Sequence, residues 1–422
     1  MTSLAELAGL VATAAHNLEG VAVRTPLQRN DRLSEATGAE VWFKREDLQP
    51  VRSYKLRGAY NLISQLTDAE RDAGVICASA GNHGQGVAWS CAALGIKGTI
   101  YVPSTTPRQK RDRMIALGQG WVELVVIGDT YDEASNTAKR VAAETGATIV
   151  PAFDDPRTAA GQGTVAKEIL DQLGTSPDLL LVPVGGGGML AGCAAWFAEH
   201  SPSTRIVGVE PAGAACMAAA LAQGEPVELT GIDTFCDGAA VAKAGAVTFP
   251  MVQEAAVEVV AVPEGEICTE MLAMYQTDGI IAEPAGALAA ASLRSARDTA
   301  PVTVQPGQTV VVIVSGGNND VSRYAEIVER SLIQEGRKHY LLVSFPQEPG
   351  ALRRFVDDVL GPDDDITYFE YVKRSNREIG PALVGIELGD PAEYPHLLER
   401  LDSSGIHAEV VSPDSPFYRF LV

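Results

Sequence analysis

The chain has 422 residues, of which 46% are hydrophobic and 21% charged, and its formal net charge is -21. This length predicts two or three domains with well-filled cores. The acidic balance argues against a nucleic-acid partner or an anionic membrane surface, because both are bound through basic residues. No apolar run approaches the roughly 20 residues that span a bilayer, so we expect no membrane partner.

The N-terminal segment predicts an amphipathic helix. It is a poor secretory signal, because no basic residues precede its apolar positions and it carries Glu6 and Glu19. The six cysteines lie far apart without a CxxC pair, so we expect small core residues and no disulfide framework. Together these features predict a cytoplasmic protein.

Short apolar runs alternate with helical patterns from about residue 41 to residue 315. The predicted strands begin at residues 41, 75, 98, 122, 148, 179, 205, 257 and 309. Strands separated by helices of this length indicate βα repeats and parallel sheets, which is an α/β fold. Ligands in such folds bind beyond the carboxyl ends of the strands, so we expect functional motifs at strand-to-helix turns.

The pattern changes after a predicted helix at residues 320–336. Strands and helices then follow in the order β-α-β-β-α-β, with predicted starts at residues 339, 350, 365, 382, 394 and 407. This is the split βαβ order of a small α+β domain. We therefore expect a separate domain from about residue 338.

The first motif is "SYKLRGAY", in which Ser53 is expected to cap a helix with Lys55 in its first turn. The positive end of the helix dipole disfavours an ammonium ion there. A neutral lysine amine can form a Schiff base with a carbonyl cofactor and later act as a general base. A single lysine is more often a solvated residue on a helix face, so the neighbouring motifs must decide.

The second motif is "SAGNHGQG" (79–86), directly after a predicted strand. Its glycines suit a turn whose backbone N–H groups face an anion, and Asn82 can bond a ring oxygen. An ordinary tight turn with a capping asparagine is about equally consistent with the pattern. His83 alone carries no weight, because a structural histidine is at least as common.

The third motif is "PVGGGGML" (183–190), whose four glycines free the backbone to wrap a phosphate at a helix N-terminus. The spacing Gly186-x-Gly188-x-x-Ala191, with Glu210 following 24 residues after Gly186, also matches a dinucleotide-binding pattern. Taken alone, this stretch is consistent with binding either a simple phosphate group or a dinucleotide.

The fourth motif is "VSGGNND" (314–320), where Ser315 follows a buried strand. A serine hydroxyl facing a heteroaromatic nitrogen would leave that nitrogen uncharged. By itself the motif fits a simple turn at a strand end.

In this order, the four motifs resemble the fold type II pyridoxal-phosphate (PLP) enzymes, whose fold is tryptophan synthase β-like. The sequences of several segments resemble those of biosynthetic threonine dehydratase, also called threonine deaminase. These segments are "KREDLQPVRSYKLRGA", "SAGNHGQG", "FDDPRTAAGQGT", "PVGGGGML", "AEPAGALA" and "VSGGNND". The C-terminal unit, with "FPQEPGALRRF", resembles the ACT-like regulatory domain of that family. The resemblance covers nearly the whole chain and favours PLP over a nicotinamide cofactor.

The resemblance implies a domain plan. A two-lobed, parallel-sheet catalytic domain would occupy residues 1–325, with a smaller lobe at about 53–150 inserted in the larger lobe. A helical linker would occupy residues 326–337, and the ACT-like domain residues 338–422.

The resemblance also implies roles for individual residues. Lys55 would hold PLP covalently and act as the catalytic base, Asn82 would bond its ring oxygen, and Ser315 would meet its ring nitrogen. The phosphate would be held by the backbone of Gly185, Gly186, Gly187, Gly188 and Met189. The substrate carboxylate would be received by the turn formed by Ser79, Ala80, Gly81, Asn82 and His83.

The implied reaction is the dehydration and deamination of threonine to 2-oxobutanoate and ammonia, the first committed step of isoleucine biosynthesis. Isoleucine would modulate it through the C-terminal domain, and a homotetramer is expected from the family. Related alternatives are a catabolic serine/threonine dehydratase or another fold type II PLP lyase. A non-catalytic amino-acid sensor is the alternative from a different class.

Three positions depart from the family patterns. Ala80 stands where racemising relatives carry serine, so we expect weak or no racemisation. Glu210 and Ala214 match two positions of a cation site found in some relatives, but Cys216 occupies the third, so Glu210 and Ala214 are candidate ligands only and we assign no metal. Ala152 stands where many relatives have proline, which leaves the choice between threonine and serine open.

Overall fold

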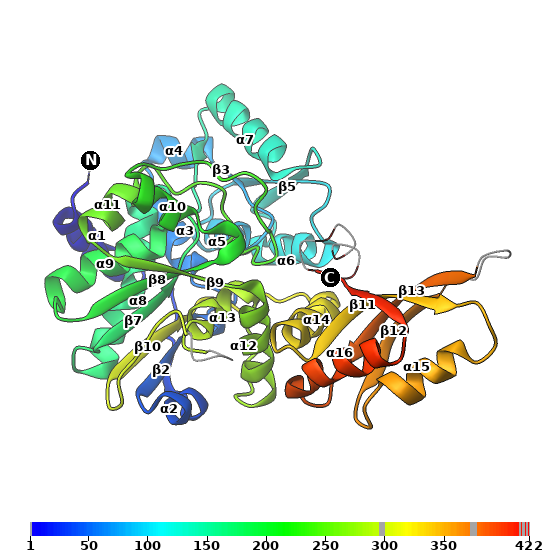
Figure 1. The fold of residues 1–422 in the computed structure, drawn as a ribbon. Helices are drawn as coiled ribbons and strands as arrows, with labels where there is room; N and C mark the ends of the chain where they lie inside the picture. Colours follow the sequence, from blue (N-terminus) through cyan, green and yellow to red (C-terminus); the bar gives the residue numbers. More distant parts are fainter. Residues whose placement is uncertain are drawn as a thin grey trace. The chain divides into compact units, whose positions relative to one another are not determined.

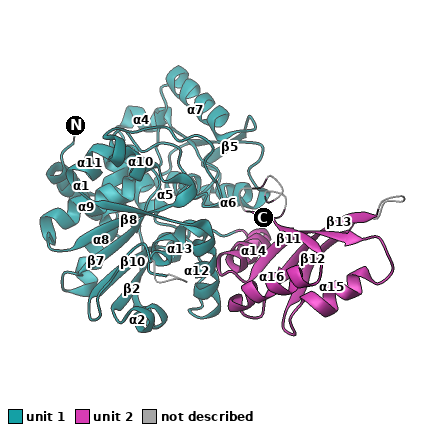
Figure 2. Cartoon of the chain, viewed as in Figure 1, with its two compact units in different colours: residues 1–319 teal, residues 320–422 magenta. Residues whose placement is uncertain are grey.

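The computed structural model describes residues 2–294, 300–371 and 378–412, together with residues 415, 418 and 421. The chain forms two compact units, residues 1–319 and residues 320–422 (Figure 2). Among the described residues, every helix is too short or too polar to cross a membrane.

A six-stranded sheet forms the centre of the first unit (Figure 1). Its order is β1-β2-β10-β7-β8-β9, and every neighbouring pair is parallel except β1 with β2. The strands are β1 (Leu27–Arg29), β2 (Glu40–Arg45), β7 (Leu179–Pro183), β8 (Arg205–Pro211), β9 (Glu258–Val262) and β10 (Thr309–Val314). Strand β7 is buried from end to end, as expected for a parallel strand with both faces covered.

A second, four-stranded parallel sheet has the order β5-β4-β3-β6. Its strands come from the chain between β2 and β7: β3 (Val75–Ala78), β4 (Gly98–Val102), β5 (Val122–Val126) and β6 (Thr148–Ile149). All the strands predicted between residues 41 and 315 are therefore confirmed. Strand β1 was missed, because its three residues are largely exposed and carry no apolar run.

Helices surround both sheets of the first unit (Figure 1). They are α1 (Leu4–Asn17), α2 (Asp31–Thr37), α3 (Lys55–Ser64), α4 (Asp68–Ala73), α5 (Asn82–Leu94), α6 (Arg108–Gly118), α7 (Tyr131–Thr145), α8 (Pro156–Leu173), α9 (Gly188–His200), α10 (Cys216–Gln223), α11 (Thr248–Glu254), α12 (Glu264–Gln276) and α13 (Pro284–Ala291). Short 3₁₀ segments are η1 (Glu46–Leu48) and η2 (Ala212–Ala214).

Helix α1 confirms the amphipathic helix predicted at the N-terminus. Ser3 and Glu6 form a capping box, in which each side chain accepts a hydrogen bond from the backbone of the other. Leu7 and Val11 are completely buried in a core cluster that includes residues of α8 and α9. The six cysteines are buried, as the sequence predicted for small core residues.

Helices α8 and α9 approach closely through glycines. A Cβ atom on Gly192 would lie 2.3 Å from the Ala159 oxygen, and one on Gly163 would lie 2.7 Å from the Gly192 oxygen. Neither position has room for a side chain. This crossing fixes α9, and with it the loop that precedes it, against the body of the unit.

The second unit is a four-stranded antiparallel sheet with helices. Its elements are η3 (Val321–Arg323), α14 (Tyr324–Gln334), β11 (Lys338–Pro346), α15 (Ala351–Val359), β12 (Asp365–Tyr371), β13 (Ile379–Glu387), η4 (Pro391–Glu393), α16 (Tyr394–Ser403) and β14 (His407–Val410). The sheet order β12-β13-β11-β14 gives the predicted split βαβ arrangement. The end of the strand predicted from residue 365 lies outside the described residues.

Helix α14 joins the second unit through polar contacts. Glu329 accepts hydrogen bonds from Tyr340 Oη at 2.6 Å and from Lys338 Nζ at 2.5 Å. The division between the units at residue 319 falls before this helix. The predicted boundary at residue 325 and the linker at 326–337 stay predictions.

We predict opposite effects for two glycine-to-alanine substitutions in helices. Gly192→Ala should lower the free energy of unfolding by about 1–3 kcal/mol, because the new methyl group must displace backbone atoms. Gly9→Ala, in α1, has no atom within 4 Å of its new Cβ and should raise that free energy by up to about 1 kcal/mol. Urea unfolding of both variants measures this. A Gly192→Ala protein as stable as the parent would contradict the described crossing.

Candidate functional site

Lys55 is the first residue of helix α3. The prediction that Ser53 caps this helix is wrong: Tyr54 occupies the cap position in a helical conformation, and no side chain caps the helix. Ser53 instead forms a β-bridge with Gly316, and the Tyr54 N–H donates to the Ser315 oxygen at 3.1 Å. These backbone contacts bring the start of α3 to the end of β10.

A buried group of charges holds helix α3 in place. Arg57 is 1% exposed and forms ion pairs with Glu46 at 2.8 Å and Glu168 at 2.7 Å. Lys44, also fully buried, pairs with Glu168. Burial opposes the ionisation of Glu46, but Arg57 and Lys44 outweigh it and hold the pKa of Glu46 below its usual value. This ion cluster (Lys44, Glu46, Arg57 and Glu168) ties α3 to β2, η1 and α8.

The Lys55 amine points to the segment that follows β6. Lys55 Nζ donates a hydrogen bond to the Ala152 oxygen at 3.3 Å. The next residue, Phe153, lies against the glycine loop (residues 185–188), where a Cβ on Gly186 would come 2.3 Å from the Phe153 ring. Residues 152–153 therefore connect Lys55 with the predicted phosphate site.

The glycine loop has no room for side chains. Added Cβ atoms would lie 2.9 Å from Ala239 O at Gly185 and 2.4 Å from the Met217 methyl group at Gly187. Gly187 also has a φ of 93°, which favours glycine. Helix α9 begins at Gly188, so the first N–H groups of that helix have no intrahelical acceptor. Such a loop can hold a phosphate through its backbone.

The loop conformation is fixed from outside. Thr248 Oγ1 donates to the Gly186 oxygen at 2.6 Å, and Cys216 Sγ lies 3.6 Å from the Gly185 oxygen as a weak donor. Both contacts use loop carbonyl groups as acceptors. No local pattern predicts this role of Thr248, because Thr248 and Gly186 are 62 residues apart in the chain.

The asparagine turn (residues 79–83) joins β3 to α5, as the sequence predicted. Ser79 Oγ accepts from the Gly81 N–H at 3.3 Å, and α5 begins at Asn82. The helix approaches α3 closely, since a Cβ on Gly86 would lie 3.1 Å from the backbone carbonyl of Lys55. The unpaired N–H groups of the first turn of α5 can receive a carboxylate.

His83 faces away from open solvent. It is 3% exposed, and its Nε2 lies 2.7 Å from the Val150 oxygen, so Nε2 carries the proton. Burial, together with the charge of Lys55, lowers the pKa of His83 to about 4. Its side chain therefore anchors the turn as a neutral donor, and only its backbone is available for the predicted substrate contact.

Asn82 has partners that the sequence analysis did not assign. Its Nδ2 donates to Glu283 Oε1 at 2.5 Å, and its Oδ1 accepts from Asn318 Nδ2 at 2.8 Å. Glu283 lies in the "AEPAGALA" motif and Asn318 in the "VSGGNND" motif. The local sequence shows an acid between apolar residues at Glu283 but does not identify its partner.

Ser315 is buried at the end of β10. It is 3% exposed, and its Oγ donates to the Ala285 oxygen at 2.9 Å. Its own carbonyl accepts from Tyr54, beside Lys55. The first and fourth sequence motifs are therefore neighbours.

The candidate metal residues have other partners. The Glu210 carboxylate accepts from the N–H groups of Met217 and Ala218 at 2.7 and 2.8 Å, while burial raises its pKa to about 7. Ala214 is buried in η2. In the described ranges, no group of three or more His, Cys, Asp or Glu side chains is arranged to hold a metal ion. Glu210 and Ala214 stay candidates only.

These residues fit PLP. The site combines an amine that can form a Schiff base, a side-chain-free loop at a helix N-terminus, an amide donor and a strand-end hydroxyl. The family model for pyridoxal-phosphate-dependent enzymes matches residues 18–316. The first unit therefore defines the chain as a fold type II PLP-dependent enzyme.

A second family model, the C-terminal regulatory domain of threonine dehydratase, matches residues 329–421. A relative named L-threonine dehydratase biosynthetic IlvA, from Mycobacterium tuberculosis, is 58% identical over 411 residues, which cover 97% of this chain and 94% of the relative. The relative of the same name from Corynebacterium glutamicum is 54% identical over 428 residues, covering 100% and 97%. The chain belongs to the biosynthetic threonine dehydratase family.

Solved structures agree on the fold. The processed form of threonine deaminase isoform 2 from Solanum lycopersicum superimposes with a TM-score of 0.70 and 38% identity, over 76% of this chain and 93% of that chain. Maize serine racemase also has a TM-score of 0.70, with 29% identity over 77% and 97%. The predicted α/β fold type II architecture with a C-terminal regulatory domain is confirmed.

We predict that His83 makes stability depend on pH between 6.5 and about 4. In this window the unfolded chain binds a proton on His83 and the folded chain does not, so stability falls as the pH falls, by up to about 1.4 kcal/mol per pH unit. His83→Gln is the matched control, because its amide can donate to Val150 O but does not titrate.

The measurement is urea unfolding of both proteins from pH 7 to pH 4.5. The stability of the parent minus that of His83→Gln should fall steadily as the pH falls. A difference that does not change with pH would show that His83 is not held neutral.

Proposed function

We propose that this protein is an L-threonine dehydratase that converts threonine to 2-oxobutanoate and ammonia, the committed step towards isoleucine. The observation that carries the proposal is the position of Lys55, whose amine lies beside Ala152 and whose helix start contacts Ser315. A silent amino-acid sensor would have no need of an amine held in this way.

In the proposed holoenzyme Lys55 holds PLP, and the glycine loop and Met189 hold its phosphate. PLP supplies a carbonyl for the substrate amine and an electron sink that acidifies the Cα hydrogen. Asn82 would donate to its ring oxygen. The Ser315 hydroxyl, which donates to the Ala285 oxygen in this structure, would serve the ring nitrogen and favour its uncharged form.

Groups of the protein then bind the substrate and remove the proton from its Cα. The N–H groups of the asparagine turn hold the substrate carboxylate, and Lys55 Nζ removes the proton from Cα. The β-hydroxyl leaves with a proton as water. The released enamine takes up water and gives 2-oxobutanoate and ammonia, so the carbon and nitrogen of threonine are fully accounted for.

Ala80 favours elimination over racemisation. It lies in the asparagine turn and carries no hydroxyl that could return a proton to the opposite face of Cα. Serine remains a second candidate substrate, because Ala152, which contacts Lys55, is smaller and less rigid than proline. Parallel assays of 2-oxo acid release from threonine and serine separate these two lyase functions.

We predict that Lys55→Ala folds, binds PLP weakly and loses at least about a thousandfold of its threonine turnover, because it lacks both the covalent anchor and the base. Lys167→Ala changes a half-buried lysine that pairs with Asp171 on α8; it is the control and should keep normal turnover. Ammonia release and far-UV circular dichroism measure activity and fold. Substantial turnover by Lys55→Ala would refute the assigned role.

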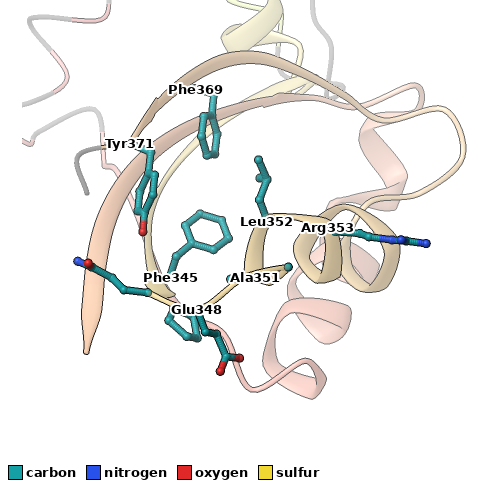
Figure 3. A pocket seen from close by; sticks show the side chains of 10 residues that line it. Phe345, Glu348, Ala351, Leu352, Arg353, Phe369 and Tyr371 are labelled. Atoms are coloured by element: carbon teal, nitrogen blue, oxygen red, sulfur yellow. The ribbon is translucent and has the colours of Figure 1, made fainter. Parts of the chain in front are cut away.

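We further propose that isoleucine binds the second unit. A pocket of about 450 Å³ lies between β11, α15 and β12, a volume that suits a small ligand. Figure 3 shows the rings of Phe345, Phe369 and Tyr371 around the cavity, with Leu352 pointing towards them. These side chains offer an apolar surface to a branched aliphatic side chain.

The polar groups of this pocket suit the carboxylate and ammonium groups of an amino acid. Helix α15 begins at Ala351 and its first residues line the pocket, so its first N–H groups, which have no intrahelical acceptors, can receive a carboxylate. Gln347 Nε2 is buried and has no hydrogen-bond partner in the described part of the chain. Glu348, also in the lining, is ion-paired with Arg354, and its carboxylate can also accept from an ammonium group.

We predict that Leu352→Ala weakens isoleucine binding about tenfold or more, since burial of a leucine side chain contributes about 1.5–3 kcal/mol. Val356→Ala, one turn further along α15, does not line the pocket and should bind isoleucine normally. Calorimetric titration with isoleucine tests both. Equal affinities, or no binding to the parent, would remove the proposed effector site.

We also propose a cytoplasmic homotetramer, as expected from the family. Size-exclusion chromatography with light scattering measures the molar mass and tests whether the protein is a tetramer. A monomer at working concentration would contradict it.

A further inference from the structure

A chain of hydrogen bonds crosses the candidate site and includes Asn82. Asn318 Nδ2 donates both to the Val51 oxygen and to Asn82 Oδ1, each at 2.8 Å. Asn82 Nδ2 in turn donates to Glu283 Oε1 at 2.5 Å. The four residues come from four segments: the loop between η1 and α3, the start of α5, the turn before α13 and the turn after β10.

The direction of this chain is fixed at both ends. A backbone carbonyl such as that of Val51 can only accept, so the Asn318 amide must turn its nitrogen towards Val51 and Asn82. Asn82 must then turn its oxygen towards Asn318. At the other end, the Glu283 carboxylate accepts from Asn82 Nδ2. Each end independently gives the Asn82 amide the same orientation.

The carboxylate of Glu283 is closely packed against neighbouring glycines. Glu283 is 4% exposed, and a Cβ on Gly316 would lie 2.1 Å from its Oε1. A Cβ on Gly238 would lie 3.8 Å from both Asn82 Nδ2 and Glu283 Oε1. The glycine after Ser315 therefore allows a carboxylate to approach Asn82, in a place where an unpaired charge would be costly.

We propose that Glu283 and Asn318 are positioning residues that fix the Asn82 amide so that it presents an N–H, and not its carbonyl, to the ring oxygen of the cofactor. An amide nitrogen has two hydrogens. One is used on Glu283, and the second is free for the ring oxygen. This inference rests on the proposed function, because it assumes that Asn82 contacts PLP.

The electrostatics of Glu283 agree with a role as acceptor in either protonation state. Burial, and the nearby charge of Asp237, raise its pKa to about 7, against the opposing effects of Asn82, Lys110 and Lys55. The charged form accepts through both oxygens, and the neutral form still has a carbonyl oxygen. The bond to Asn82 therefore survives protonation.

A double-mutant cycle on PLP affinity tests the proposal. Glu283→Met keeps a long side chain but has no acceptor, and it should raise the PLP dissociation constant about tenfold, the equivalent of about 1.4 kcal/mol. In an Asn82→Ala background the same substitution should have no further effect, because Glu283 then has nothing to orient. Asn318→Leu should behave in the same way.

Glu283→Gln is the conservative control. Its amide oxygen can still accept from Asn82 Nδ2, so the PLP dissociation constant should stay within about threefold of the parent value. The readout is fluorescence titration of the PLP-free proteins, with melting temperatures measured in parallel. Should Glu283→Met not fold, Glu283→Ala carries the same test.

The possible results distinguish a failure of the positioning role of Glu283 from a failure of the proposed function. A loss of affinity with Glu283→Met that persists fully in the Asn82→Ala background would overturn the positioning role, as would an unchanged affinity. If the parent protein takes up no PLP, the proposed function fails and not the hydrogen-bond chain alone.

Discussion

The pairing of Arg57 with Glu46 and Glu168 is the interaction on which the site depends most. Arg57 lies two residues after Lys55 in the same helix, and its ion pairs reach η1 and α8. Removing one partner from a buried pair costs on the order of 3–5 kcal/mol, because an uncompensated charge is left behind. The ion cluster therefore does more than stabilise the first unit: it fixes the direction in which the first turn of α3 presents its lysine.

Close backbone approaches complete the site around this helix. Gly86 lets α5 reach the Lys55 carbonyl, and Gly186 lets Phe153 cover the glycine loop. The two parallel sheets thus contribute strand ends to one place, the asparagine turn from one and Ser315 with the glycine loop from the other. At Gly186 an added Cβ would overlap the Phe153 ring, whereas at Gly86 it would lie 3.1 Å from the Lys55 backbone and require a small shift.

Much of this arrangement could be predicted from local sequence. Buried strands followed by glycine-rich turns identify the parallel strands and their ligand-binding edges. The same turns mark Lys55, Asn82 and Ser315 as candidates, and the family resemblance assigns their roles. The Ser53 cap was wrong because a long-range bridge to Gly316 overrides local capping preference. Glu283 was not assigned because its partner Asn82 is 201 residues away, and no local pattern reports such a pair. Strand β1 was missed because pairing with β2, and not burial, defines it.

The central claim is that Lys55 forms the covalent bond with PLP. The most direct measurement is borohydride reduction of the purified holoprotein, followed by peptide mapping of the pyridoxyl group. The account predicts one modified lysine, in the peptide that contains Lys55. A modified lysine elsewhere, or a protein that takes up no PLP and carries no pyridoxyl group after reduction, would contradict it.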